Sequence, residues 1–205
     1  MNTFSAKDLL TRSCMQIKMF AEHPEIKPQP SSMMMYGEKF QRAVADTIQG
    51  VIGEEMRGSY KCIGYDIAIN FSNDIVCNDK IIEVKSVTGE APAWYLESSL
   101  LQCALYKSLI LCGANDLVTA SFYANLGNER KHAHFGPFDR FRYILIFGEE
   151  KYEVNVYDPW QIVGFFEYKA SCCTGTWDLA KNWDLRYKHR EFECLKRFFG
   201  FKQIF

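Results

Sequence analysis

The chain has 205 residues, of which 48% are hydrophobic and 15% aromatic, so it can bury a sizeable core and is not a disordered chain. The formal net charge is −1, from 24 basic and 25 acidic residues, which excludes a polybasic nucleic-acid binder. No repeat or linker interrupts the sequence. We expect a single domain over residues 1–205, with a C-terminal extension from about residue 160.

No apolar run approaches the roughly 18 residues that a membrane span requires, and charges at Lys7, Asp8 and Arg12 argue against a signal peptide. We therefore expect a cytoplasmic protein without a membrane partner. The eight cysteines are irregularly spaced, which predicts reduced thiols rather than a disulfide scaffold.

Apolar periodicity predicts helices and strands in alternation, and hence an α/β fold with a central mixed β-sheet flanked by helices. Three prolines mark an irregular connector after the first helix. In chain order, the predicted elements are helices over 1–22 and 37–51, strands over 60–63 and 65–71, a polar turn over 72–80, a strand over 81–84, a helix over 94–112, strands over 117–123, 143–147 and 154–157, and a helix over 184–199.

Charged residues interrupt the predicted strands around residues 65–85. Side chains alternate along a strand, so Glu83 and Lys85 project from one face, and Asp66 begins the neighbouring strand. Carboxylates suit Mg²⁺ or Mn²⁺, and a lysine beside the metal can orient water and stabilise charge on a phosphate. Asp66, Glu83 and Lys85 are therefore the predicted catalytic residues of a phosphodiesterase.

Two alternatives stay open for this segment. Glu83-Val-Lys85 is also compatible with the solvated face of an edge strand. Asp74 and Asp79 are rival carboxylates, but aspartate is common in turns because it bonds the local backbone. We assign both to the predicted turn, with Asp74 as the second choice for the metal ligand.

The predicted helix over 94–112 places Gln102 and Tyr106 on one face, because they are four residues apart. Farther along, Arg186, Lys188 and Arg190 alternate with aromatic and histidine residues. Such mixtures suit a groove that tracks a nucleic-acid backbone, although charged helix faces are commoner.

Asp66, Glu83-Val-Lys85 and Gln102-x-x-x-Tyr106 together resemble the PD-(D/E)XK nuclease superfamily, specifically its RecB-like branch, over roughly residues 1–110. The resemblance implies a restriction-endonuclease-like fold and a Mg²⁺- or Mn²⁺-dependent deoxyribonuclease. It suggests an exonuclease in recombination, repair or phage DNA processing, in a bacterial or phage-infected cell. The partner would be single-stranded DNA or duplex ends, with Gln102 and Tyr106 anchoring the substrate strand or bracing the site.

The same resemblance extends to Tyr36-Gly-Glu38-Lys-Phe-Gln41, which is similar to the first motif helix of the branch. Gln41 stands where the branch often has a histidine ligand, so Glu38 is the acidic residue that we assign to the metal with Asp66 and Glu83. A solvated helix residue is the alternative for Glu38. For the function of the whole chain, the alternative to a nuclease is a catalytically inactive module that binds nucleic acid or a protein.

Some members of the branch hold an iron–sulfur cluster through one N-terminal and three C-terminal cysteines. Cys14, Cys172, Cys173 and Cys194 invite this comparison. Adjacent cysteines do not easily ligate one cuboidal cluster, so we favour free thiols over a cluster.

Overall fold

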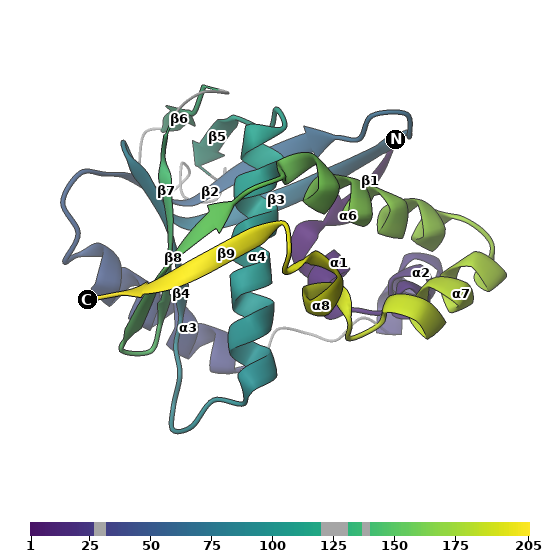
Figure 1. Ribbon diagram of the computed structural model, residues 1–205, viewed down its shortest axis with the longest axis horizontal. Helices are drawn as coiled ribbons and strands as arrows, with labels where there is room; N and C mark the ends of the chain where they lie inside the picture. The colour runs from purple at the N-terminus through teal and green to yellow at the C-terminus, as the bar shows by residue number, and fades with distance from the viewer. Residues whose placement is uncertain (27–31, 120–130, 137–139) are drawn as a thin grey trace.

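The computed structural model describes residues 1–26, 32–119, 131–136 and 140–205 (Figure 1). Its described strands form one mixed sheet with the order β6-β5-β2-β3-β4-β7-β8-β9, and β1 pairs with β3 off this path. The β1–β3 and β4–β7 pairs are parallel, and the others are antiparallel. The strands are β1 Asn2–Ser5, β2 Val51–Lys61, β3 Ile67–Cys77, β4 Lys80–Lys85, β5 Asp116–Thr119, β6 His132–His134, β7 Arg142–Phe147, β8 Glu150–Val156 and β9 Phe199–Ile204.

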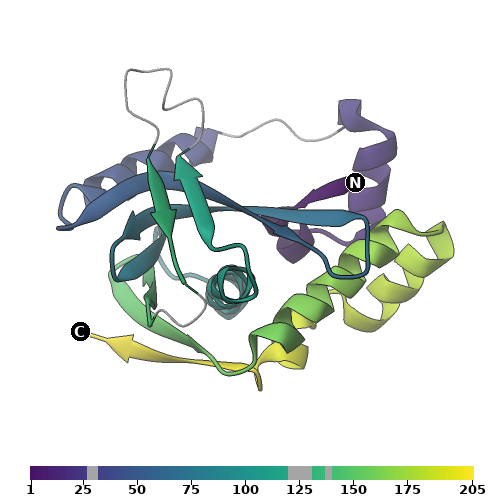
Figure 2. The same cartoon turned by 90° about the horizontal axis from the view of Figure 1, so that it is seen from above.

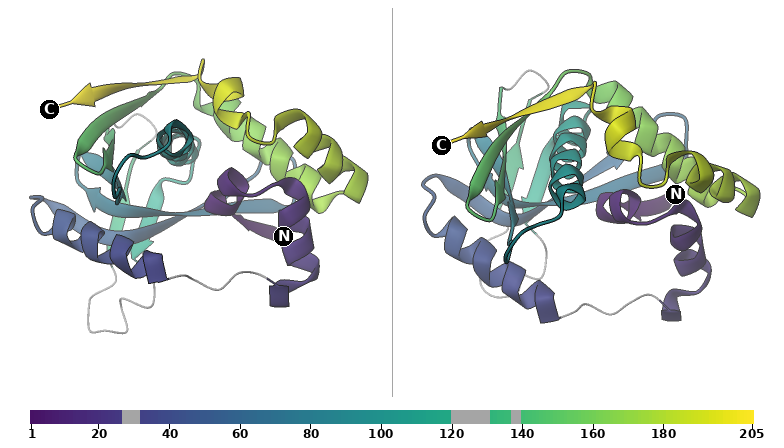
Figure 3. Two further views of the ribbon diagram at one scale, coloured as in Figure 1. Left: turned by 90° about the horizontal axis from the view of Figure 1, so that it is seen from below. Right: turned by 60° about the horizontal axis from the view of Figure 1, so that its bottom comes forward.

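Helices cover both faces of the sheet, which confirms the predicted fold class of a mixed central sheet flanked by helices. Seen from above, α4 is viewed nearly end-on with the strands curving around it (Figure 2). The views of Figure 3 place α3 outside this curve. The helices are α1 Ala6–Thr11, α2 Cys14–Glu22, the 3₁₀ turn η1 Pro24–Ile26, α3 Ser32–Ala45, α4 Ala93–Leu111, α6 Pro159–Thr174, α7 Trp177–Tyr187 and α8 Glu191–Leu195.

The two sheet faces bury separate hydrophobic clusters. The larger lies on the inner face, where α4 contributes Leu105 and Leu109, both fully buried. The smaller lies on the outer face, where Val44 of α3 packs against a cluster that includes Ile82 of β4. Alternate residues of β4 therefore pack in different clusters. Because both faces of the strand are covered, its sequence is a nearly continuous apolar run.

The N-terminal segment is not the single helix that its periodicity predicts. Residues 2–5 pair with β3 as a parallel strand, and Ser13 separates α1 from α2. The Ser13 hydroxyl accepts from the amide of Gln16, whose side chain accepts from the amide of Ser13. This reciprocal capping starts a new helix at Cys14.

The predicted polar turn over residues 72–80 is also wrong, because β3 continues to Cys77 and only two residues separate it from β4. Asn73 is fully buried yet satisfied: its amide donates to the Met56 carbonyl, and it accepts from the Tyr143 hydroxyl at 2.8 Å. Partners on other strands thus allow a polar residue inside a strand.

The predicted C-terminal helix over 184–199 is split in the structure. Helix α7 ends at Tyr187, His189 has a φ of 62°, and the chain continues through the short α8 into β9. The strand β9 pairs with β8 and so returns the last residues to the sheet. The predicted strand over 117–123 is described only through Thr119, since residues 120–123 lie outside the described part.

None of the described helices combines the length and the apolar character needed to cross a membrane.

Candidate active site

The inner face of the sheet carries a cluster of polar residues from β3, β4 and α4. Ile75 pairs with Ile82 and Val76 with Ile81, so the antiparallel register places Asp74 opposite Glu83. Next to this pair, the main-chain amide of Val84 donates to a side chain instead of a main-chain carbonyl: its acceptor is Asp74 Oδ2, at 2.8 Å. The Asp74 carboxylate therefore lies between the two strands.

Glu83 is the centre of this cluster and is only 2% exposed. Its Oε1 accepts from Lys85 Nζ at 2.7 Å and from Gln102 Nε2 at 2.6 Å. Its Oε2 is buried and has no hydrogen-bond partner among the described residues. A buried carboxylate oxygen without a partner costs free energy, and a bound cation would remove that cost.

The charges of the cluster act on one another. Burial raises the pKa of Asp74, and the neighbouring carboxylate of Glu83 raises it further. Burial lowers the pKa of Lys85, but Glu83 and Asp74 raise it by more, so its net shift is upward. Lys85 is thus held as an ammonium ion beside two acids.

The residues predicted on the helix after this strand reach the cluster in different ways. Gln102 of α4 contacts Glu83 directly. Tyr106, one turn farther along, is 3% exposed and packs against Phe71 of β3 with ring centroids 5.4 Å apart. Tyr106 is therefore placed to brace the site rather than to contact a substrate strand.

Asp66 does not belong to the cluster, which corrects the expectation that it partners Glu83. It precedes β3, eight residues from Asp74, a separation of roughly 26 Å along an extended strand. Its side chain is 81% exposed and lies 2.8 Å from the N-terminal amine. The sequence predicts a strand that ends at Phe71, whereas β3 continues to Cys77 and carries Asp74 to the cluster.

Asp74, the second choice from the sequence, occupies the place assigned to Asp66. Glu55 of β2 was not predicted at all: its carboxylate accepts from Ser72 Oγ at 3.1 Å and contributes to the raised pKa of Asp74. Its φ of 50° lies in the left-handed region, which is rare for a non-glycine residue. The flanking pairs Glu54–Ile75 and Met56–Asn73 place this irregularity opposite Asp74. No local pattern in the sequence marks Glu55.

The proposed third ligand, Glu38, lies on α3, and its side chain is outside the described part of the structure. Gln41 on the same helix donates from Nε2 to the main-chain oxygen of Asp74 at 3.2 Å, which ties α3 to the site. Among the described residues, no group of three or more histidine, cysteine or acidic side chains is arranged to hold a metal ion. The pair of Asp74 and Glu83 still fits Mg²⁺, which often uses one or two carboxylates and keeps several waters.

The basic residues predicted to bind substrate are not brought to this cluster. Arg186, Lys188 and Arg190 are exposed at the end of α7 and just beyond it. The main contacts of α7 are with α2 and α6, away from β3 and β4. Helix α7 and helix α3 lie on opposite sides of the molecule in Figure 1.

The cysteines also depart from the expectation of free thiols. Cys14 of α2 and Cys173 of α6 form a disulfide across 159 residues of sequence. Cys172 and Cys194 are free. The disulfide uses two of the four cysteines that invited comparison with a cluster.

Comparisons with known proteins find a similarity in structure but none in sequence. No model of a known protein family matches the sequence, and neither does any curated protein. The fold is similar to the crystal structure of SSO0001, with a TM-score of 0.53 and 17% sequence identity over 83% of this chain and 76% of that chain. At this identity the likeness concerns the fold alone.

Proposed function

We propose that the chain is a Mg²⁺- or Mn²⁺-dependent deoxyribonuclease of the restriction-endonuclease-like type, acting in the cytoplasm as an exonuclease on single-stranded DNA or duplex ends. The observation that carries the proposal is the cluster of Asp74, Glu83, Lys85 and Gln102, in which Glu83 is buried and the other three are half-buried. These residue types in this spatial arrangement suit phosphodiester hydrolysis, because two carboxylates beside the single ammonium of Lys85 leave an excess of negative charge that a bound cation would offset.

Asp74 and Glu83 would hold the metal ion, with the unpartnered Oε2 of Glu83 available to it. The ion would polarise the phosphate and lower the pKa of a bound water. Gln102 fixes the Glu83 carboxylate through its 2.6 Å hydrogen bond. Lys85 keeps its proton beside the two acids, so it would stabilise negative charge on the phosphate and orient the attacking water rather than act as a base. From the family resemblance, the products would carry 5′-phosphate ends.

The experiment is a cleavage assay on linear and circular DNA, single- and double-stranded, with Mg²⁺, with Mn²⁺ and with excess EDTA. We expect cleavage of linear DNA with either metal and none in EDTA. Glu83→Gln should lose cleavage, whereas Asp66→Asn, changed at an exposed carboxylate far from the cluster, should retain it. Undiminished cleavage in EDTA would exclude the metal mechanism.

The competing function is a module that binds nucleic acid or protein without cleaving. It is favoured by the lack of a third acidic, histidine or cysteine ligand among the described residues. DNA binding that is unaffected by Glu83→Gln, with no cleavage under any metal condition, would support this alternative.

A further inference from the structure

The face of α4 that meets Glu83 continues as a row of side chains toward the start of the helix. Gln102, which donates to Glu83, is preceded at four-residue intervals by Ser98 and Trp94. Side chains four residues apart lie one above the other on a helix, so these three form one row. Gln102 and Ser98 are half-buried, and Trp94 is 67% exposed. The row therefore leads from the buried carboxylate to the surface.

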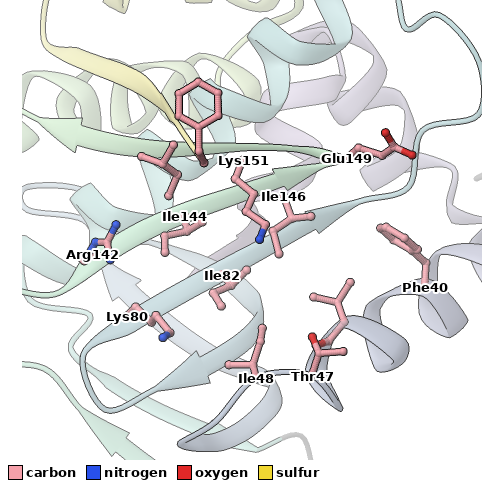
Figure 4. Close-up of a pocket in the computed structure, with 14 residues that line it drawn as sticks. Phe40, Thr47, Ile48, Lys80, Ile82, Arg142, Ile144, Ile146, Glu149 and Lys151 are labelled. Atoms are coloured by element: carbon pink, nitrogen blue, oxygen red, sulfur yellow. The ribbon is translucent and has the colours of Figure 1, made fainter.

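The alternation of β4 shows which side of the sheet this row occupies. Ile82 lies on the outer face, where it lines a pocket between β4 and α3 (Figure 4). Side chains alternate along a strand, so Glu83 and Lys85 point to the inner face, on which α4 packs. The loop over 86–92 then joins the end of β4 to the start of α4. Trp94, the second residue of the helix, therefore lies on the same side of the sheet as the candidate active site.

Aromatic contacts tie Trp94 to the strands that carry the site. Its ring centroid lies 5.9 Å from that of Tyr95, and the ring centroid of Tyr95 lies 5.2 Å from that of Phe147 on β7. Phe147 is the register partner of Lys85. Tyr95 is seven residues before Gln102, close to two full turns, so it faces the same way along the helix. Tyr95 thus connects the exposed ring of Trp94 to the strand pair that holds Lys85.

The position of this exposed indole suits a base of the substrate. Trp94 is eight residues before Gln102, which is roughly 12 Å along the helix axis. At about 3.4 Å per nucleotide of a stacked strand, this distance corresponds to about three or four nucleotides. Aromatic side chains bind single strands by stacking on bases, without regard to sequence. A strand with a phosphate at Glu83 and Lys85 would thus bring one of its bases against Trp94.

The charges beside Trp94 favour a base over a phosphate as its ligand. Glu97 is three residues farther along α4, so it lies beside Trp94 on the helix surface. Glu90, in the loop that enters the helix, is a second acid at this end. Acidic neighbours repel a phosphate, whereas stacking depends on ring contact and not on charge. Lys85, at the other end of the row, supplies the positive charge for the phosphate.

We propose that Trp94 stacks on a base of the bound DNA strand, about three or four nucleotides from the scissile phosphate, and that Tyr95 holds its ring in place. This role of Trp94 rests on the proposed nuclease function and adds a substrate contact to it. Trp94 contacts the strand equally before and during the reaction, because it lies far from the reacting phosphate. Its loss should therefore raise KM and leave kcat nearly unchanged.

The test is steady-state cleavage of a single-stranded DNA of about 12 nucleotides with Mg²⁺. Trp94→Ala should raise KM by about five- to a hundredfold, at about 50 mM and about 200 mM KCl alike, while kcat stays within about twofold. Trp94→Phe, which keeps an aromatic face, should recover most of the lost affinity, whereas Trp94→Leu should not. The matched control is Trp160→Ala, at another exposed tryptophan at the start of α6, and it should leave KM unchanged.

An unchanged KM in Trp94→Ala, or an equal rise in Trp160→Ala, would overturn the inference. A fall in kcat with an unchanged KM would mean that Trp94 supports the fold of the site, and equal recovery by Trp94→Leu and Trp94→Phe would mean apolar packing instead of stacking. Either result would overturn it as well. Failure of the proposed function is distinguishable, because the parent protein would then cleave no DNA before any change at Trp94, and the inference would fall with it.

Discussion

The carboxylate of Asp74 accepts a hydrogen bond from the main-chain amide of Val84 at 2.8 Å. This contact fixes an acid of β3 against the middle residue of Glu83-Val84-Lys85 on β4. A side chain thus fills a position that a backbone carbonyl would occupy in a continuous ladder, and the two acids are held on one face of the sheet.

The first prediction concerns the identity of the metal-binding aspartate. Asp74→Asn keeps the shape and the acceptor for Val84 but removes the charge, so it should abolish or strongly weaken Mn²⁺ binding and stop cleavage. Asp66→Asn should leave both unchanged, since Asp66 contacts the N-terminal amine instead. Calorimetric titration of the two variants with Mn²⁺ measures this difference. Loss of binding in the Asp66 variant alone would contradict the assignment.

The second prediction concerns Lys85, which we expect to matter for folding as well as for turnover. Lys85→Ala should lower kcat by at least two orders of magnitude. It also leaves Glu83, 2% exposed, with Gln102 as its remaining partner, so the free energy of unfolding should fall by about 3 kcal/mol. Urea unfolding and steady-state cleavage measure the two effects.

The control for this variant is Lys61→Ala at the exposed end of β2, which should change neither quantity. Adding Mg²⁺ should recover part of the lost stability of Lys85→Ala, because a cation would again face Glu83. A variant with full activity would refute the role of Lys85 in the chemistry.

The third prediction concerns the ion pair between Arg142 and Glu153. Hydrogen bonds from Arg142, assisted by Lys202, lower the pKa of Glu153. A lowered native pKa stabilises the fold above the pKa of the unfolded chain, about 4.3, and this contribution is lost as the pH falls through the native value. Glu153→Gln should therefore be less stable than the parent protein at pH 7 by up to about 1 kcal/mol.

The difference between the two proteins should shrink as the pH falls below about 4, which urea unfolding at pH 7, 5 and 3.5 can follow. A difference that stays constant over this range would mean that the glutamate stabilises through packing and not through its charge.

The fourth prediction concerns the disulfide between Cys14 and Cys173. Because it closes a loop of 159 residues in the unfolded chain, its reduction should lower the free energy of unfolding by about 2–5 kcal/mol. Cys14→Ser should show a similar loss that dithiothreitol does not increase. Cys194→Ser, at a free and partly exposed cysteine, is the control and should respond to dithiothreitol as the parent protein does. Stability that is independent of reductant in the parent protein would contradict the bond.

The sequence by itself determined the fold class and most of the regular elements. Nearly continuous apolar runs marked β4 and β7, and apolar spacing marked α4, because most of β4 and β7 and much of α4 is buried. The spacing of Glu83 and Lys85 on one strand, and of Gln102 on the next helix, also follows from local geometry alone.

Tertiary structure decided which aspartate joins them. Asp74 and Asp66 flank the same apolar stretch, and local propensity assigns the polar run after Phe71 to a turn. Only the contacts of Asn73 with Met56 and Tyr143, from two other strands, make it favourable for that run to remain in the sheet. The placement of Glu55 and the pairing of Cys14 with Cys173 likewise depend on residues that are distant in sequence. Packing brings these residues together, and no periodic pattern in the sequence predicts such contacts.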